Sequence, residues 1–177
     1  MFDLSILAKW AEEKPNEAAF VDELHSINFE ELNSLVRKTA MLLSNYGVKK
    51  GDVVNIVLPS FASWTTILAV QYLGATSMTF HGISKLKIPF QVDWNISALS
   101  EDFVPSNRNI IFSDSLFDII KSTKEFSEPI SFKSKEETVR ILSTSGTTGD
   151  TKFVPFLVSD LNQLDSRISS WEVQGLG

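Results

Sequence analysis

The fold class is decided by residues 53–80, VVNIVLPSFASWTTILAVQYLGATSMTF. The stretch begins with six residues that are β-branched and nearly all apolar, which is typical of a strand buried on both faces. Pro59-Ser60 interrupts it, and residues 61–73 then carry apolar side chains at helical spacing. Gly74 ends that helix before a second strand at 75–80. A strand, a helix and a strand of these lengths predict a right-handed crossover in a parallel sheet.

The segment before this stretch predicts an amphipathic helix that begins after Asn28. Asn28 is a good N-cap residue, and Glu31 stands three residues later, where it can complete a capping box. Gly47 is placed to end the helix with a positive φ. Further upstream we expect three shorter elements, a helix at 4–11 and strands at 18–21 and 26–27 that pair with each other.

The segment after it is harder to interpret. Residues 81–105 combine Gly and Pro with weak periodicity, and we expect them to be mostly irregular. Beyond them the pattern predicts strands at 109–112, 130–132, 139–142 and 153–157, a helix from Ser113 or Asp114 to Lys121, and a final helix capped by Ser159 or Asp160.

These elements predict an α/β fold with a mostly parallel sheet flanked by helices. The chain has 177 residues, of which 43% are hydrophobic and 21% are charged, as in an ordinary globular domain. We see no internal repeat and no linker that would divide it, so residues 1–177 are expected to form one unit.

Composition excludes several classes of function. A net charge of −6 without a cluster of Lys or Arg argues against a nucleic-acid partner. The absence of Cys excludes disulfides and thiol nucleophiles, and with only two His we predict no metal site in this chain alone. Residues 53–84 contain no charged residue, but polar residues and Pro59 interrupt them, so we expect no transmembrane segment. The acidic start does not resemble a secretory signal, and we expect a cytoplasmic protein.

The strongest chemical signal is residues 143–152, STSGTTGDTK, between two apolar runs. Gly146 and Gly149 allow the backbone to approach a ligand closely, and successive N–H groups in such a turn form an anion-binding nest. The hydroxyl groups add donors, and Lys152 adds a positive charge. The spacing is not that of a Walker A loop. The pattern therefore indicates a polyphosphate site, and the alternative is a flexible polar hairpin loop.

The motif TSGTTGxxK at residues 144–152 resembles the phosphate-binding signature of the adenylate-forming enzymes. That superfamily includes acyl- and aryl-CoA synthetases, adenylation domains of nonribosomal peptide synthetases, and firefly luciferase. Further patterns resemble the N-terminal part of the family in order and spacing, namely INFEEL at 27–32, GVKKGDVV at 47–54 and LGA at 73–75.

The resemblance implies part of the large N-terminal domain of an enzyme that activates a small carboxylic acid with ATP and Mg2+. Such enzymes form an acyl-adenylate, release pyrophosphate and pass the acyl group to a thiol, which is coenzyme A or the pantetheine of a carrier protein. By carry-over, the residues implied to bind the ATP phosphates are Thr144, Ser145, Gly146, Thr147, Thr148, Gly149 and Lys152.

The sequence departs from the family pattern at two positions in the motif region, and three later segments of the family do not occur in it. Thr151 and Phe153 stand where the family usually has Pro and Gly. The family's later segments, aromatic-Gly-x-Thr-Glu, Thr-Gly-Asp and a late catalytic Lys, do not occur in residues 1–177. We therefore expect a fragment without catalytic residues that is inactive alone. Its partner would be the missing C-terminal portion. We also expect that the fragment can self-associate through the surfaces that this portion would cover. The alternative is a non-catalytic module that binds a nucleotide or a protein.

The remaining candidates have ordinary structural interpretations. His25 and His81 are expected at surface turns, and the pairs Glu101-Asp102 and Glu136-Glu137 are expected to be solvated. The tryptophans are expected in the core or at an interface, and they are Trp10, Trp64, Trp94 and Trp171.

Overall fold

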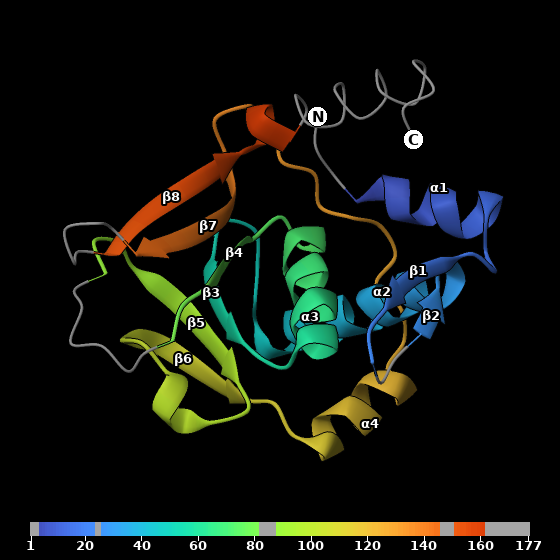
Figure 1. The fold of residues 1–177 in the computed structure, drawn as a ribbon, viewed down its shortest axis with the longest axis horizontal. Coiled ribbons are helices and arrows are strands. Elements are labelled where there is room, and N and C mark those ends of the chain that lie inside the picture. Colours follow the sequence, from blue (N-terminus) through green and yellow to red (C-terminus); the bar gives the residue numbers. More distant parts are fainter. Residues whose placement is uncertain (1–3, 24–25, 82–87, 146–150, 162–177) are drawn as a thin grey trace.

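The fold is a mixed α/β arrangement built on one six-stranded sheet (Figure 1). The structure is a computed structural model that describes residues 4–23, 26–81, 88–145 and 151–161. The strands lie in the order β6-β5-β3-β4-β7-β8. All neighbours are parallel except β7 and β8, which are antiparallel. Their bounds are β3 Val53–Val57, β4 Thr76–Thr79, β5 Val92–Ser97, β6 Ser106–Ile111, β7 Thr138–Ser145 and β8 Thr151–Leu157.

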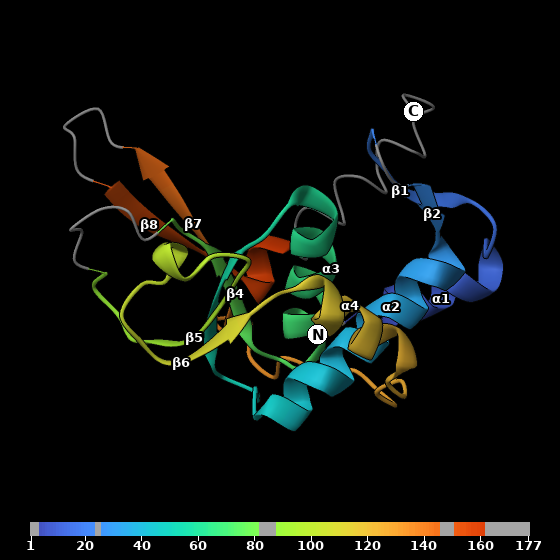
Figure 2. The same ribbon diagram turned by 90° about the horizontal axis from the view of Figure 1, so that it is seen from below.

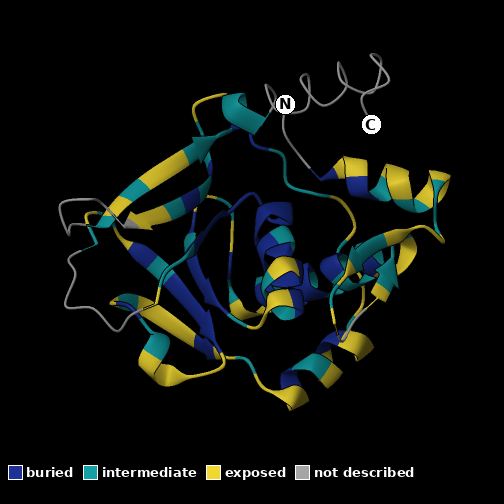
Figure 3. Cartoon of the chain, viewed as in Figure 1, coloured by how far each residue is buried: buried dark blue, intermediate teal, exposed yellow. Residues whose placement is uncertain are grey.

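Helices cover one face of this sheet, which confirms the predicted fold class. Helix α3 (Ser60–Tyr72) packs on β3 and β4, and α2 (Phe29–Tyr46) packs on the outside of α3 (Figure 2). Helix α4 (Asp114–Ser122) follows β6 and contacts α2. Figure 3 shows the buried residues concentrated in α3 and the central strands. The crossover β3-α3-β4 therefore forms the core of the molecule, as residues 53–80 predict.

Local signals before the core are confirmed in detail. The Asn28 side chain accepts a hydrogen bond from the Glu31 N–H at 2.8 Å, and the Glu31 carboxylate accepts one from the Asn28 N–H at 3.0 Å. Gly47 has a φ of 103° and ends α2. Upstream, α1 (Ser5–Glu13) packs against α2, and β1 (Ala18–Val21) pairs antiparallel with β2 (Ser26–Asn28) in a separate two-stranded sheet.

The expectation that residues 81–105 are mostly irregular is wrong for β5, which lies between β3 and β6 in the sheet. Apolar and polar residues alternate along β5, which is a strand pattern that the surrounding Gly and Pro residues outweighed in the sequence analysis. The polar residue Asn95 is nevertheless buried, with 1% of its surface exposed. Its side-chain carbonyl accepts from Asn55 Nδ2 at 3.1 Å, and its Nδ2 donates to the Val104 carbonyl at 2.8 Å. The buried amide is thus satisfied by groups that are distant in the sequence.

Two further predictions are corrected. Residues 130–132 form no strand, because the Ile130 N–H donates to the Tyr72 carbonyl and the segment crosses the end of α3 instead of joining the sheet. The last helix begins at Val158, so neither Ser159 nor Asp160 precedes it. Asp160 instead accepts the Leu157 N–H at 2.8 Å from within the first turn.

No helix in the described part of the chain combines the length and apolar character that crossing a bilayer requires.

Candidate functional site

The loop singled out by the sequence connects β7 to β8. Strand β7 runs parallel to β4, so the loop leaves the sheet at the edge where the carboxyl ends of the parallel strands meet. Ligands of open α/β sheets bind outside this edge. Of the predicted phosphate-binding residues, the structure describes Thr144, Ser145 and Lys152. The others lie outside the described residues, and they are Gly146, Thr147, Thr148 and Gly149.

The base of the loop brings two of the predicted residues together. Thr144 lies opposite Lys152 in the antiparallel pair, and Ser145 lies opposite Thr151. Opposite residues of an antiparallel pair present their side chains on the same face, with Cβ atoms about 5 Å apart. The Thr144 and Lys152 side chains are both exposed. A hydroxyl donor and an ammonium group therefore flank the start and the end of the loop.

A second positive charge lies on the same face of β7. Arg140 is four residues before Thr144, and side chains alternate along a strand, so both occupy one face. Its guanidinium reaches the Thr79 hydroxyl at 3.5 Å, and burial lowers its pKa. Among the described residues, the buried Nη1 atom of Arg140 has no hydrogen-bond partner. The sequence analysis did not identify Arg140. An Arg within a strand that leads into a glycine-rich loop could have indicated a second positive charge near that loop.

Aromatic packing holds the hairpin against the rest of the sheet. The Phe153 ring lies 5.3 Å from the Phe80 ring and 5.3 Å from the Phe90 ring, with both pairs edge-on. Phe80 is itself fixed by Asn55, which accepts its N–H at 2.9 Å and donates to its carbonyl at 3.0 Å. Phe153, which departs from the family pattern, thus anchors the residue next to Lys152.

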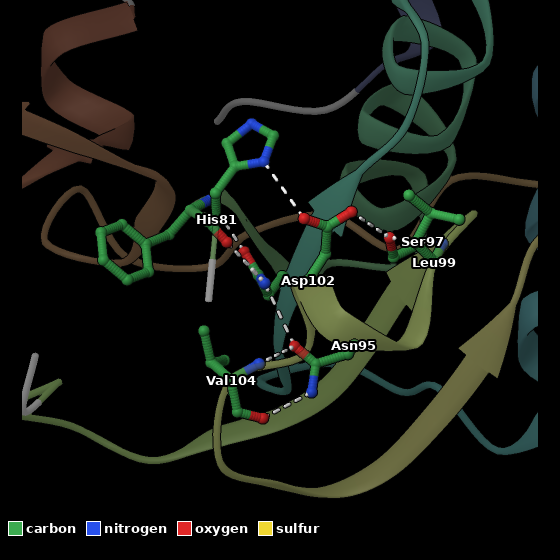
Figure 4. Close-up of polar contacts among 8 residues, drawn as sticks. His81, Asn95, Ser97, Leu99, Asp102 and Val104 are labelled. Carbon is green, nitrogen blue, oxygen red and sulfur yellow. Dashed lines mark hydrogen bonds and ion pairs between the residues drawn. The ribbon is translucent and has the colours of Figure 1, made fainter. Parts of the chain in front are cut away.

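A polar cluster lies at the same edge of the sheet, just past the end of β4 (Figure 4). His81 Nδ1 is 3.4 Å from Asp102 Oδ1, and Asp102 Oδ2 accepts from the Ser97 hydroxyl at 3.1 Å. The His81 side chain is 65% exposed, whereas that of Asp102 is 13% exposed. The expectation that Asp102 is simply solvated is therefore wrong. Because Nδ1 faces Asp102, the other ring nitrogen of the exposed His81 side chain, Nε2, does not take part in this contact.

The sequence could not reveal this cluster, because His81 and Asp102 are separated by 21 positions. They meet because residue 81 follows β4 while Asp102 belongs to the short 3-10 helix η1 (Ser100–Asp102) after β5. The sequence offers only a weak indication of this cluster, namely that polar residues follow the ends of two parallel strands.

The other candidates from the sequence are buried in the core, exposed on the surface or outside the described residues. Trp94 is buried, and its Nε1 donates to Asp52 at 3.0 Å. Trp10 and Trp64 are exposed, while Trp171 and His25 lie outside the described residues. Within the described ranges, no group of three or more His, Asp or Glu side chains is arranged to hold a metal ion.

Comparisons with known proteins point to one enzyme family. Residues 7–83 match the model of the AMP-binding enzyme family. The chain is 32% identical over 148 residues to a 2-succinylbenzoate–CoA ligase from Geobacillus sp. (strain WCH70), which covers 79% of this chain and 30% of that protein. It is 28% identical over 156 residues to enterobactin synthase component F from Escherichia coli O157:H7, which covers 85% of this chain and 12% of that protein. The chain thus spans less than a third of these two relatives.

Solved structures show the same fold. A long-chain-fatty-acid–CoA ligase from Archaeoglobus fulgidus superposes with a TM-score of 0.71 at 22% identity, over 87% of this chain and 36% of that one. The O-succinylbenzoate coenzyme A synthetase from Bacillus subtilis, in complex with AMP, superposes with a TM-score of 0.69 at 20% identity. The superposition covers 93% of this chain and 44% of that one. Residues 7–83 therefore match the AMP-binding, or adenylate-forming, enzyme family, and the chain has the fold of the N-terminal part of these enzymes.

Proposed function

We propose that this chain is part of an ATP-dependent ligase that activates a carboxylic acid as an acyl-adenylate and passes the acyl group to a thiol, that of coenzyme A. In the first step a carboxylate oxygen attacks the α-phosphorus of ATP, and the bond to the β-phosphate breaks to release pyrophosphate. The observation that carries the proposal is the position of the TSGTTGxxK motif, which connects β7 to β8 at the carboxyl edge of the sheet.

The role proposed for the hairpin is to hold the β- and γ-phosphates. Thr144 and Lys152 provide an O–H donor and an ammonium group at the base of the loop, which suits phosphate oxygens. Arg140 adds a positive charge on the same face of β7. Donors fixed in advance around the leaving pyrophosphate stabilise the charge that develops as the bond breaks. Phe153 maintains this arrangement by packing the start of β8 against Phe80 and Phe90.

The described residues offer no acidic cluster for Mg2+. In the proposed reaction Mg2+ would arrive with the nucleotide, bound to its phosphates, where it would neutralise part of their charge. His81 is proposed to contact the same ligand through Nε2, with Asp102 positioning its ring.

The first test is titration of the 177-residue chain with pyrophosphate and with Mg·ATP by calorimetry. We expect Lys152→Ala to weaken pyrophosphate binding about tenfold, because it removes a charge-assisted hydrogen bond. Lys124→Ala, which removes another exposed lysine far from the hairpin in sequence, is the matched control and should bind as the wild type does. Equal affinities for the two variants would contradict the role of the loop.

The second candidate is a module that binds a nucleotide or a protein without catalysis, and it is favoured by Phe153 and Thr151 at positions where the family usually has Gly and Pro. A module that binds a nucleotide would share this binding with the ligase, so ATP–pyrophosphate exchange is needed to separate the two candidates. We expect no exchange from residues 1–177, which lack the family's later motifs. Sequencing the coding DNA past the Gly177 codon, and assaying the longest encoded chain with a panel of carboxylic acids, then decides between the two candidates. Exchange supports the ligase, and its absence supports the module.

A further inference from the structure

A second candidate site lies at the carboxyl edge of the sheet, on the other side of β4 from the hairpin. It is a cavity of about 570 Å³ whose lining includes the residues that follow β3, β5 and β6, namely Leu58, Ala98 and Phe112. The chain order reverses at this point, because β4 pairs with one side of β3 and β5 with the other. Such a switch point is where open α/β sheets bind ligands. We call it the switch-point cavity.

The walls of the switch-point cavity are apolar and firmly held. Three phenylalanines contribute the largest side chains, namely Phe61 from the first turn of α3, Phe112 after β6 and Phe117 from α4. Phe61 is 8% exposed, and its ring lies 5.5 Å from that of Phe20. The volume lies in the range of about 300–1,000 Å³ that is usual for small-molecule pockets. The shape therefore suits a compact apolar ligand.

The charges around the cavity are all of one sign. Three carboxylates line it, from Asp22, Glu23 and Asp114, and its lining contains no Lys, Arg or His. A carboxylate already lies at the positive, N-terminal end of the α3 dipole, because the Ser60 hydroxyl donates to Asp22 Oδ2 at 3.2 Å. Asp114 is the first residue of α4 and occupies the corresponding place there. An anion would gain little from the two helix N-termini and would be repelled by the carboxylates.

We propose that the switch-point cavity binds a small apolar ligand that carries a positive charge, such as an aromatic or branched amine. The apolar part fills the space between Phe61 and Phe117, and the ammonium group lies at the acidic rim. This ligand is chemically opposite to the carboxylic acid and polyphosphate proposed for the hairpin. The site therefore stands whether or not the proposed function holds.

The test uses two probes of equal shape and opposite charge, 4-phenylbutylamine and 4-phenylbutyrate, measured with the full 177-residue chain by saturation-transfer NMR titration. Ala98 is exposed, and Ala98→Phe places a large side chain in the cavity. Any probe binding that this variant loses relative to the wild type is therefore assigned to the cavity. We expect the cavity to take the amine at least about fivefold more tightly than the carboxylate. The double variant Glu23→Gln, Asp114→Asn should lose most of this preference.

Two controls make the result decisive. Glu12→Gln removes an exposed carboxylate on α1 and should leave the preference for the amine unchanged. Ala62→Leu fills the cavity from α3 and should repeat the loss seen with Ala98→Phe, which guards against misfolding of one variant. Amine binding that survives both filling variants, or a cavity that takes the carboxylate as tightly as the amine, would overturn the proposal.

Discussion

The core crossover and the β7–β8 hairpin are stabilised in different ways. In β3, four of five residues are buried, and α3 covers the strand. In β8 no residue is buried, and the strand is held by pairing with β7 and by the Phe153 ring (Figure 3). The core is thus a rigid scaffold, while the hairpin that carries the TSGTTGxxK motif rests at its edge. A loop held on such a scaffold is a common arrangement for binding sites.

The largest expected effect tests this difference directly. Ile56→Ala removes a fully buried side chain of β3 and should lower the free energy of unfolding by about 3 kcal/mol. Val154→Ala shortens a side chain on β8 that is 42% exposed, and it should change that free energy by less than about 0.5 kcal/mol. Urea denaturation followed by circular dichroism measures both. Similar losses for the two variants would show that the hairpin belongs to the same cooperative core.

The same contrast explains what the sequence could predict. The capping box of Asn28 and Glu31 and the positive φ of Gly47 depend on neighbouring residues, so they were predicted correctly. Strand β5 was missed because its short alternation of apolar and polar residues lies among Gly and Pro residues that favour an irregular segment. The alternation could not show that Asn95 is buried, because its hydrogen-bond partners, including Asn55, are distant in the sequence.

The site was predictable to the same extent. The motif at residues 144–152 is local, and its described residues lie at the carboxyl edge of the sheet. Arg140 and the His81–Asp102 contact were missed, because they acquire their meaning only when β4, β5 and β7 are brought together. Side chains from separate strands form a constellation that no single window of sequence contains.

Gly74 and Gly51 test how closely the core packs against the segment around Ile130, which leads to β7. Gly74 has a φ of 68°, and a Cβ at this position would lie 2.9 Å from the Ile130 carbonyl oxygen. Gly51 has a φ of 85°, but a Cβ there would meet nothing within 4 Å. Gly74→Ala should therefore cost about 2–3 kcal/mol of stability, against about 1 kcal/mol for Gly51→Ala.

Thermal unfolding of the two variants measures this difference. The backbone strain is common to both, so the excess loss in Gly74→Ala reports the crowding of the new Cβ against Ile130 and the Lys50 side chain. Equal losses would mean that the connection moves away from α3 without cost, and the core and the hairpin would then be coupled only through the sheet.

The smallest expected effect concerns Glu137, which links the start of β7 to the core. Its carboxylate accepts the Ser134 N–H at 2.8 Å and that of Lys133, and it lies 3.3 Å from the Lys50 ammonium. These contacts, led by the Ser134 hydrogen bond, hold the pKa of Glu137 below its ordinary value. A carboxyl group whose pKa is lowered by folding stabilises the protein above its unfolded-state pKa, and this contribution disappears as the pH falls through the folded-state pKa.

Glu137→Gln should therefore lower the free energy of unfolding at pH 7 by about 0.5 kcal/mol, since the pair is partly exposed and screened by solvent. The difference from the wild type should shrink as the pH falls below about 5. Urea titrations at several pH values measure it, with Glu128→Gln as the control for loss of an exposed carboxylate. A deficit that stays constant down to pH 3 would show that Glu137 acts through packing and not through its charge. The start of β7 would then be attached to the core by shape alone.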